Sequence, residues 1–120
     1  MKVTALDIVT ATQGFGELMG MSLPIALSFK LARLAKAINA EAKVIFEERD
    51  KLIRKHGTKN AQGVFEVPPN TPEMEAFNAD VKVLFAQEVP LDLEPVELPA
   101  TLELKPGTLL AAFPFITLPA

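Results

Sequence analysis

One unbroken stretch, from Leu23 to His56, constrains the fold of this chain more than any other feature. Its only proline is Pro24, which suits a first helical position, where the missing N–H costs nothing. Gly57 suits the position just past a helix end, where a left-handed conformation is favoured. The pattern predicts one long amphipathic helix over residues 24–56, about 50 Å long at roughly 1.5 Å per residue. The apolar positions that recur every seven residues are Leu31, Ile38, Ile45 and Leu52.

A shorter helix is predicted ahead of the long one, over residues 4–20. Thr4 and Asp7 have the spacing of a capping box, with Asp in place of the usual Glu. Glycines within this stretch each cost about 1 kcal/mol relative to alanine, so they either allow close approach of the long helix or end the short helix early. Because the connection to Pro24 is short, the two helices are expected to be antiparallel neighbours. The glycines are Gly14, Gly16 and Gly20.

A third helix is predicted over residues 72–88. Thr71 and Pro72 form a strong start signal, with a capping side chain followed by proline at the first helical position. A short strand is predicted just before it, over residues 64–67, and a polar turn connects that strand to Gly57. The apolar residues of the third helix form one stripe, which should lie on the helical hairpin.

The chain changes character at Pro90, and six of its ten prolines follow from that point on. Short alternating segments predict two or three edge-type strands, because proline is confined to strand edges and bulges. A helical turn is expected over residues 106–112, and an extended apolar tail over residues 113–120. The expected fold is therefore mainly α, with a helical hairpin, a third packed helix and a small β region. We divide it into a helical domain, residues 1–89, and an extended arm, residues 90–120.

The charge of the chain is divided between its two halves. Residues 1–60 hold ten Lys and Arg against six Asp and Glu, a net of +4, whereas residues 61–120 hold two against nine, a net of −7. A uniformly basic chain would suggest a nucleic-acid partner. The division instead indicates that one half meets the other, within the chain or between neighbouring copies. The 49% hydrophobic content is high for 120 residues and suggests that some apolar surface is buried against other chains.

Sequence features exclude several classes of protein. The absence of cysteine excludes disulfides and thiolate sites. Asp7, Gln13 and Glu17 interrupt the N-terminal apolar residues, so no export signal is expected. No run of about 18 apolar residues predicts a membrane span.

Charged residues of the long helix are interpreted as a solvated surface. Residues 47–50 are the densest charge cluster, which we expect to form local ion pairs such as Glu47–Lys51 and Asp50–Arg54 rather than a carboxylate site. The basic residues of this helix lack the interleaved aromatics of a stacking platform, so nucleic-acid binding is disfavoured. These basic residues include Lys30, Arg33, Lys36 and Lys43.

His56 is the only histidine, and nothing near it in sequence supplies a nucleophile or an orienting acid. We expect it to contact the last carbonyls of the long helix. The segment from Gly14 to Gly16 lacks the spacing of a phosphate-binding loop. No enzymatic activity, cofactor, metal site or small-molecule substrate is expected.

Several segments together resemble a family of small proteins encoded by tailed bacteriophages and prophages. They are LPIALSFKLARLAKAI, FEERDKLIRKHG and FNADVKVLFAQEVPLDLEPVEL, of which RDKLI, KHG and VPLDLEPVEL are the most specific. The resemblance covers about residues 4–98 and offers no catalytic residues to carry over. Members are commonly encoded near virion components. The resemblance therefore implies a structural protein that acts in many copies in the virion or its assembly, as a head, connector or tail component.

That resemblance also implies partners and a location. The partners are other phage structural proteins or copies of the same chain, and the location is the virion, assembled in the host cytoplasm. The alternative is a small phage-encoded regulator that binds host protein or nucleic acid.

Apolar side chains near the C-terminus are predicted to carry the partner contact. Burying one Phe or Leu contributes about 1.5–3 kcal/mol, so several would offset the ordering of a segment that proline has already stiffened. The alternative is that the tail folds back over its own helices. The predicted partner-binding residues are Leu109, Leu110, Phe113, Phe115, Ile116 and Leu118.

Overall fold

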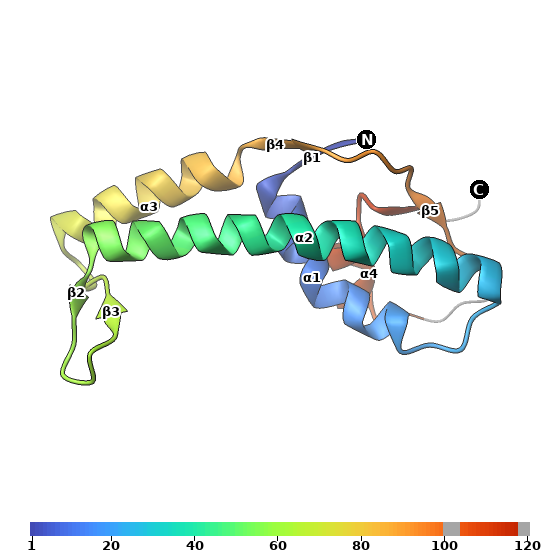
Figure 1. Cartoon of the computed structure of the whole chain (residues 1–120), viewed down its shortest axis with the longest axis horizontal. Coiled ribbons are helices and arrows are strands. Elements are labelled where there is room, and N and C mark those ends of the chain that lie inside the picture. The colour runs from blue at the N-terminus through green and yellow to red at the C-terminus, as the bar shows by residue number, and fades with distance from the viewer. Residues whose placement is uncertain (100–103, 118–120) are drawn as a thin grey trace.

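The structure, a computed structural model, describes residues 1–99 and 104–117 of the chain. It is mainly helical, as the sequence predicts, and elongated, with principal dimensions of 49 × 28 × 22 Å. One long helix runs through the whole length of the molecule, and the other elements pack along it (Figure 1). The described helices are α1 (Ala5–Met19), α2 (Ile25–His56), α3 (Pro72–Phe85) and α4 (Pro106–Ala112). The described strands are β1 (Lys2–Thr4), β2 (Thr58–Lys59), β3 (Phe65–Glu66), β4 (Glu88–Pro90), β5 (Val96–Glu97) and β6 (Ile116–Thr117).

The first helix, α1, confirms the predicted capping box. The Thr4 hydroxyl accepts a hydrogen bond from the Asp7 N–H at 3.2 Å, and the Asp7 carboxylate accepts one from the Thr4 N–H at 3.0 Å. Two of the unpaired donors at the helix start are thereby satisfied. Together with α2, the helix forms the predicted hairpin, and its buried face contributes Ile8, Phe15 and Leu18 to the core.

The long helix α2 confirms the predicted rod almost residue for residue. The heptad positions Leu31, Ile38 and Ile45 are buried. Gly57 follows the helix but has φ −99° and ψ 173°, so the expectation of a left-handed glycine is wrong. The chain goes directly from the helix into β2, and a side chain at Gly57 would collide with the carbonyl oxygens of Ile53 and Glu66. Glycine is required at this position because there is no room for a side chain, and not because the backbone adopts a left-handed conformation.

The third helix ends at Phe85, three residues earlier than predicted. The residues that follow form β4, which pairs antiparallel with β1 and opposes Val89 to Val3. The ladder extends to the first residue, because the Met1 amino group donates to the Leu91 carbonyl at 2.7 Å and the Leu91 N–H donates to the Met1 carbonyl at 2.8 Å. The start of the chain thereby fixes the end of α3.

The two other strand pairs in the described chain lie at opposite ends of α2. The strands β2 and β3 form an antiparallel hairpin that projects from the C-terminal end of α2, where the sequence predicts a short strand (Figure 1). The strands β5 and β6 pair in parallel, with Val96 opposite Ile116. The C-terminal segment is thereby anchored to the chain that precedes it.

The short helix α4, which the sequence predicts as part of an extended arm, packs against α1. A side chain at Gly14 would lie 2.9 Å from the Ala111 Cβ and 3.0 Å from the Thr108 carbonyl oxygen, so only glycine allows this approach. The Thr108 hydroxyl also donates a hydrogen bond to the Glu17 carboxylate. The sequence analysis expects the glycines of α1 to allow close approach of α2, but the helix that closely approaches Gly14 is α4. Residues 1–89 and the described residues that follow them thus share one hydrophobic core.

Packing differs between the two ends of the molecule, which we name here. The packed end comprises α1, residues 25–45 of α2, β5 and residues 106–117, which run from α4 to β6, and it holds most of the buried side chains. The distal arm comprises residues 46–56 of α2, the β2–β3 hairpin and α3, and none of its described residues is buried. The two ends lie at opposite ends of α2 (Figure 1).

Candidate functional site

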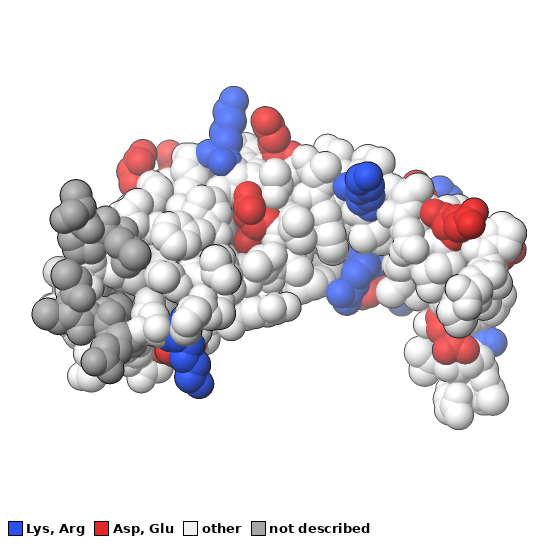
Figure 2. Space-filling model, turned by 180° about the vertical axis from the view of Figure 1, so that it is seen from behind, with Lys and Arg blue, Asp and Glu red and all other residues white. Residues whose placement is uncertain are grey.

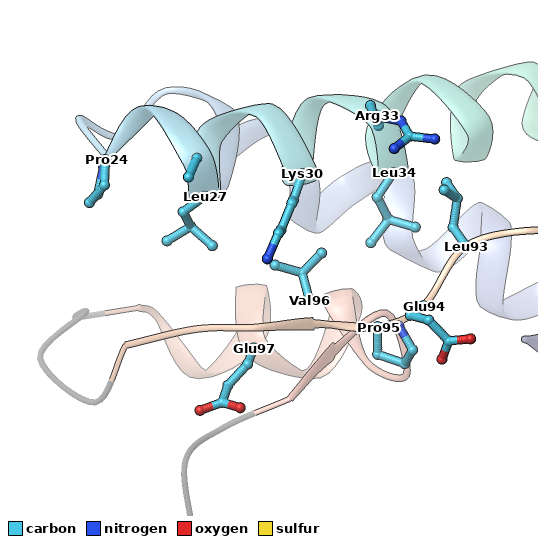
Figure 3. A pocket seen from close by; sticks show the side chains of 11 residues that line it. Pro24, Leu27, Lys30, Arg33, Leu34, Leu93, Glu94, Pro95, Val96 and Glu97 are labelled. Carbon is cyan, nitrogen blue, oxygen red and sulfur yellow. The ribbon is translucent and has the colours of Figure 1, made fainter.

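A groove of about 600 Å³ lies between the first half of α2 and the segment that leads into β5. Leu27 and Leu34 of α2 point down into it, and Val96 of β5 points up from the opposite side (Figure 3). Among the side chains that line the groove, Leu34 and Val96 are buried, while Leu27 is only partly covered. Its floor is therefore apolar.

Charged side chains of opposite sign border the two sides of the groove. On the α2 side, the amino group of Lys30 reaches down toward Val96 and the guanidinium of Arg33 lies along the edge (Figure 3). On the β5 side, the carboxylates of Glu94, which precedes β5, and of Glu97 point away from α2. All four side chains are exposed, and the ion pairs of the described residues include none of them. We call the first pair the basic wall and the second pair the acidic wall.

A second polar site joins the end of α2 to α3. The His56 Nε2 lies 2.7 Å from the Asp80 Oδ2, and since a carboxylate only accepts, the imidazole N–H donates this bond. The Lys55 ammonium lies 3.5 Å from the same oxygen. The hydrogen bond from His56, with a smaller contribution from the charge of Lys55, lowers the pKa of the Asp80 carboxyl.

The sequence analysis expects His56 to contact the last carbonyls of α2, whereas the hydrogen bond of its ring joins it to Asp80. The ring also packs edge-on against Phe77, with the two ring centroids 6.4 Å apart. Only 14% of the His56 side chain is exposed. The site thus combines a charged hydrogen bond with an aromatic contact, and both hold α3 against α2.

The acidic cluster at residues 47–50 forms local ion pairs, but not the expected ones. Lys51 contacts Glu48 at 2.9 Å instead of Glu47, and Asp50 contacts Arg49 at 3.8 Å instead of Arg54. The hydrogen bond with Glu48 raises the pKa of Lys51. Within the described chain, no three His, Cys, Asp or Glu side chains converge as a metal site. The cluster is a charged helix surface.

Charges of both signs are scattered over the face of the molecule that Figure 2 shows. Blue and red side chains alternate along it, and uncharged surface separates them. Such a face does not have the single sign that attracts a phosphate backbone. Within the described residues, no helix combines the length and the apolar character needed to cross a membrane.

The six predicted partner-binding residues separate into distinct environments. Phe115 and Ile116 are fully buried in the chain's own core, where the Phe115 ring meets that of Phe15 edge-on at 6.2 Å. For these two, the prediction of a partner surface is corrected, because the chain's own core covers both side chains. Leu109 is partly buried in the core, whereas Leu110 and Phe113 are 74% and 41% exposed. Leu118 lies outside the described residues.

Sequence reasoning missed the groove and the Asp80 partner of His56. Lys30 and Glu97 are far apart in sequence, and only the return of the chain through β4 brings β5 beside α2. A signal for Asp80 was present, because an acid on the expected inner face of the third helix needs a cation, and the basic end of the long helix supplies one. No local sequence pattern indicates the groove, because its two sides come from distant segments of the chain.

Three comparisons with known proteins complete this description. The chain matches no family model, no curated protein and no solved structure.

Proposed function

We propose that this chain is a non-enzymatic structural protein of a tailed-bacteriophage particle, acting in multiple copies in the virion or during its assembly. Its partners are other structural proteins of the particle or further copies of itself. Its location is the virion, which is assembled in the host cytoplasm. The proposal joins the resemblance of residues 4–98 to an observation about the surface of the molecule.

That observation is the distribution of exposed apolar side chains along the molecule. At the packed end, Ile25 is 85% exposed and Phe29 is 62% exposed, one helical turn apart. In the distal arm, Val64, which directly precedes β3, is 59% exposed, and Val83 of α3 is 61% exposed. Apolar surface therefore occurs near both ends of a molecule 49 Å long. Exposed apolar patches mark contact surfaces, and surfaces near both ends suit a subunit with more than one neighbour.

The polar sites support a structural role over a catalytic one. The His56–Asp80 pair has the residue types of a general-base dyad. Its ring is largely covered, and its contacts are to Asp80 and Phe77, which lie on the neighbouring helix. In this arrangement the pair fastens two helices together. The groove offers apolar side chains and two charged walls, which suit recognition of another surface.

Particle composition tests this proposal directly. Particles purified on a density gradient are digested and examined by mass spectrometry for peptides of this chain. We expect peptides at a constant ratio to the major virion protein, retained after a salt wash that removes adsorbed host proteins. A cytoplasmic host protein of similar abundance serves as the contamination control. Absence from particles and from assembly intermediates contradicts the proposal.

A separate binding experiment tests the alternative, that the chain is a regulator. The purified chain is titrated against duplex DNA and single-stranded RNA at two salt concentrations. A mobility shift that weakens with salt, combined with absence from particles, favours the regulator. The structural proposal expects no such shift.

A further inference from the structure

We infer that the groove between α2 and β5 is a self-association interface, in which a second copy of this chain docks with a two-fold axis parallel to the groove. The occupant is identified by the charge arrangement of the two walls. The inference concerns the isolated chain, so it holds or fails independently of the virion assignment.

The two walls are each of a single sign over a long stretch of sequence. Residues 23–40, which supply the basic wall, contain Lys30, Arg33 and Lys36 and no acidic residue. Residues 91–104, which supply the acidic wall, contain acidic residues and no basic one. Opposite charges are thus held on opposite sides of one apolar groove. Within the described chain, the ion pairs leave both walls available to another molecule.

Symmetry decides which docking makes use of both walls. If two grooves face each other about an axis that runs along them, the rotation carries each basic wall over to the acidic wall of the other copy. An axis across the grooves would instead place like charges together. The first arrangement is isologous, and it forms the basic-to-acidic contact twice. Docking about a two-fold axis along the groove is therefore the closed arrangement in which each basic wall faces an acidic wall of the other copy.

Partners of a single charge sign fit this groove less well. A polyanion would be attracted by the basic wall but repelled by the acidic wall. A basic peptide would be attracted by the acidic wall but repelled by the basic wall. Electrostatic complementarity selects partners by suppressing such like-charge contacts. A second copy presents both signs in the required order.

The groove has the composition of a protein interface. Leu27 and Val96 supply the apolar centre, and the two charged walls supply a polar rim. An apolar centre with a polar rim is the usual composition of such an interface. At about 100° per residue on a helix, the exposed side chains of Phe29 and Ile25 lie on the opposite side of α2 from Leu27, outside the groove.

Sedimentation velocity of the whole chain over a range of concentrations tests the inference. We expect a monomer–dimer equilibrium for the natural sequence. The K30E/R33E variant reverses the basic wall, and the E94K/E97K variant reverses the acidic wall. Each variant alone should weaken dimerisation by roughly 100-fold or more, because like charges then face each other twice. The matched control K43E/K82E reverses two exposed basic charges outside the groove and should leave the equilibrium unchanged.

Mixing the two reversed variants provides the decisive outcome. In the mixed dimer, the reversed wall of the K30E/R33E copy, now acidic, would face the reversed wall of the E94K/E97K copy, now basic. The two walls that keep their natural sequence would face each other at the second contact. We therefore expect a 1:1 heterodimer from two variants that are monomeric alone. Circular dichroism confirms that each variant remains folded.

Other outcomes overturn the inference. If the natural chain stays monomeric at all concentrations, the groove does not bind a second copy. This conclusion holds even if the K30E/R33E variant fails to enter particles, because that failure would then have another cause. Open-ended oligomers indicate head-to-tail docking, which contradicts the two-fold axis. A mixture of reversed variants that stays monomeric also contradicts it. Presence or absence in particles is measured separately, so failure of this inference is distinguishable from failure of the proposed function.

Discussion

The packed end and the distal arm share one helix but are stabilised in different ways. In the first half of α2, Leu31, Leu34 and Ile38 are at most 1% exposed and pack beneath several other elements. Beyond Ile45 the same helix has α3 and a two-residue strand pair as its described neighbours, and its apolar side chains are only half-covered. The amphipathic pattern is nearly the same in both halves. Burial therefore depends on how many elements return to the helix, which the pattern of the helix alone does not determine.

This difference has a functional consequence. A helix pair with half-covered apolar stripes gains less from burial than a closed core, since the hydrophobic contribution is proportional to the area removed from water. The distal arm compensates with a charged hydrogen bond, His56 to Asp80, and an aromatic contact between His56 and Phe77. A region held in this manner opens more easily, and it has apolar surface left for a neighbour.

The largest difference between the ends is expected from removing one phenylalanine ring at each. Phe115→Ala in the packed end should lower the free energy of unfolding by about 3–5 kcal/mol, because it leaves a cavity around a fully buried position. Phe77→Ala in the distal arm should cost about 1 kcal/mol, because that ring is only partly covered. Urea unfolding followed by circular dichroism measures both. Equal losses would contradict the comparison.

A second pair of variants tests close packing within the packed end itself. Gly14→Ala should destabilise the fold by about 1–3 kcal/mol, because the new methyl group meets Ala111 and the Thr108 carbonyl. Gly16→Ala adds the same methyl group to the same helix with no atom within 4 Å. It should stabilise the fold by about 0.5–1 kcal/mol through better helix propensity. Thermal melting gives the two signs, and a stabilising Gly14→Ala would show that α4 does not pack here.

The smallest effect is a pH dependence confined to the distal arm. The pKa of Asp80 is lowered in the fold, so its stabilising contribution is present above the ordinary pKa of an unfolded carboxyl group. That contribution disappears as the pH falls through the lowered pKa. Asp80→Asn should therefore loosen α3 at neutral pH, and the difference from the natural chain should vanish in acid.

Side-chain NMR of Phe77 at several pH values measures this effect. Asp50→Asn is the matched control, because Asp50 is exposed on the same end of α2 and makes only a 3.8 Å contact with Arg49. A difference between Asp80→Asn and the natural chain that persists unchanged in acid contradicts the role given to the carboxylate.

Local signals in the sequence account for the elements that were predicted correctly. The capping box at Thr4, the uninterrupted heptads of α2 and the proline at the start of α4 act within a few residues, so the sequence displays them directly. The predicted end of α3 is too late because Glu88 and Val89 pair with β1, which lies 84 to 86 positions earlier in the chain (Glu88 with Thr4, 88 − 4 = 84; Val89 with Val3, 89 − 3 = 86).

The sites depended on contacts between distant segments and were therefore largely missed. His56 and Asp80 are 24 positions apart. Ile116, which the sequence analysis places in an extended apolar tail, is buried and pairs with Val96 of β5. Apolar composition indicates that a segment will be buried, but not whether its own chain or a partner covers it.

Amide hydrogen exchange on the natural chain tests the central claim, that one end is a closed core and the other a lightly held arm. Mid-helix amides of α1 and of residues 31–45 in α2 should exchange only through global unfolding. Those of α3 should exchange much faster, through local opening that leaves the packed end intact. Equal protection of α3 and α1, lost together in one cooperative step, would contradict the account.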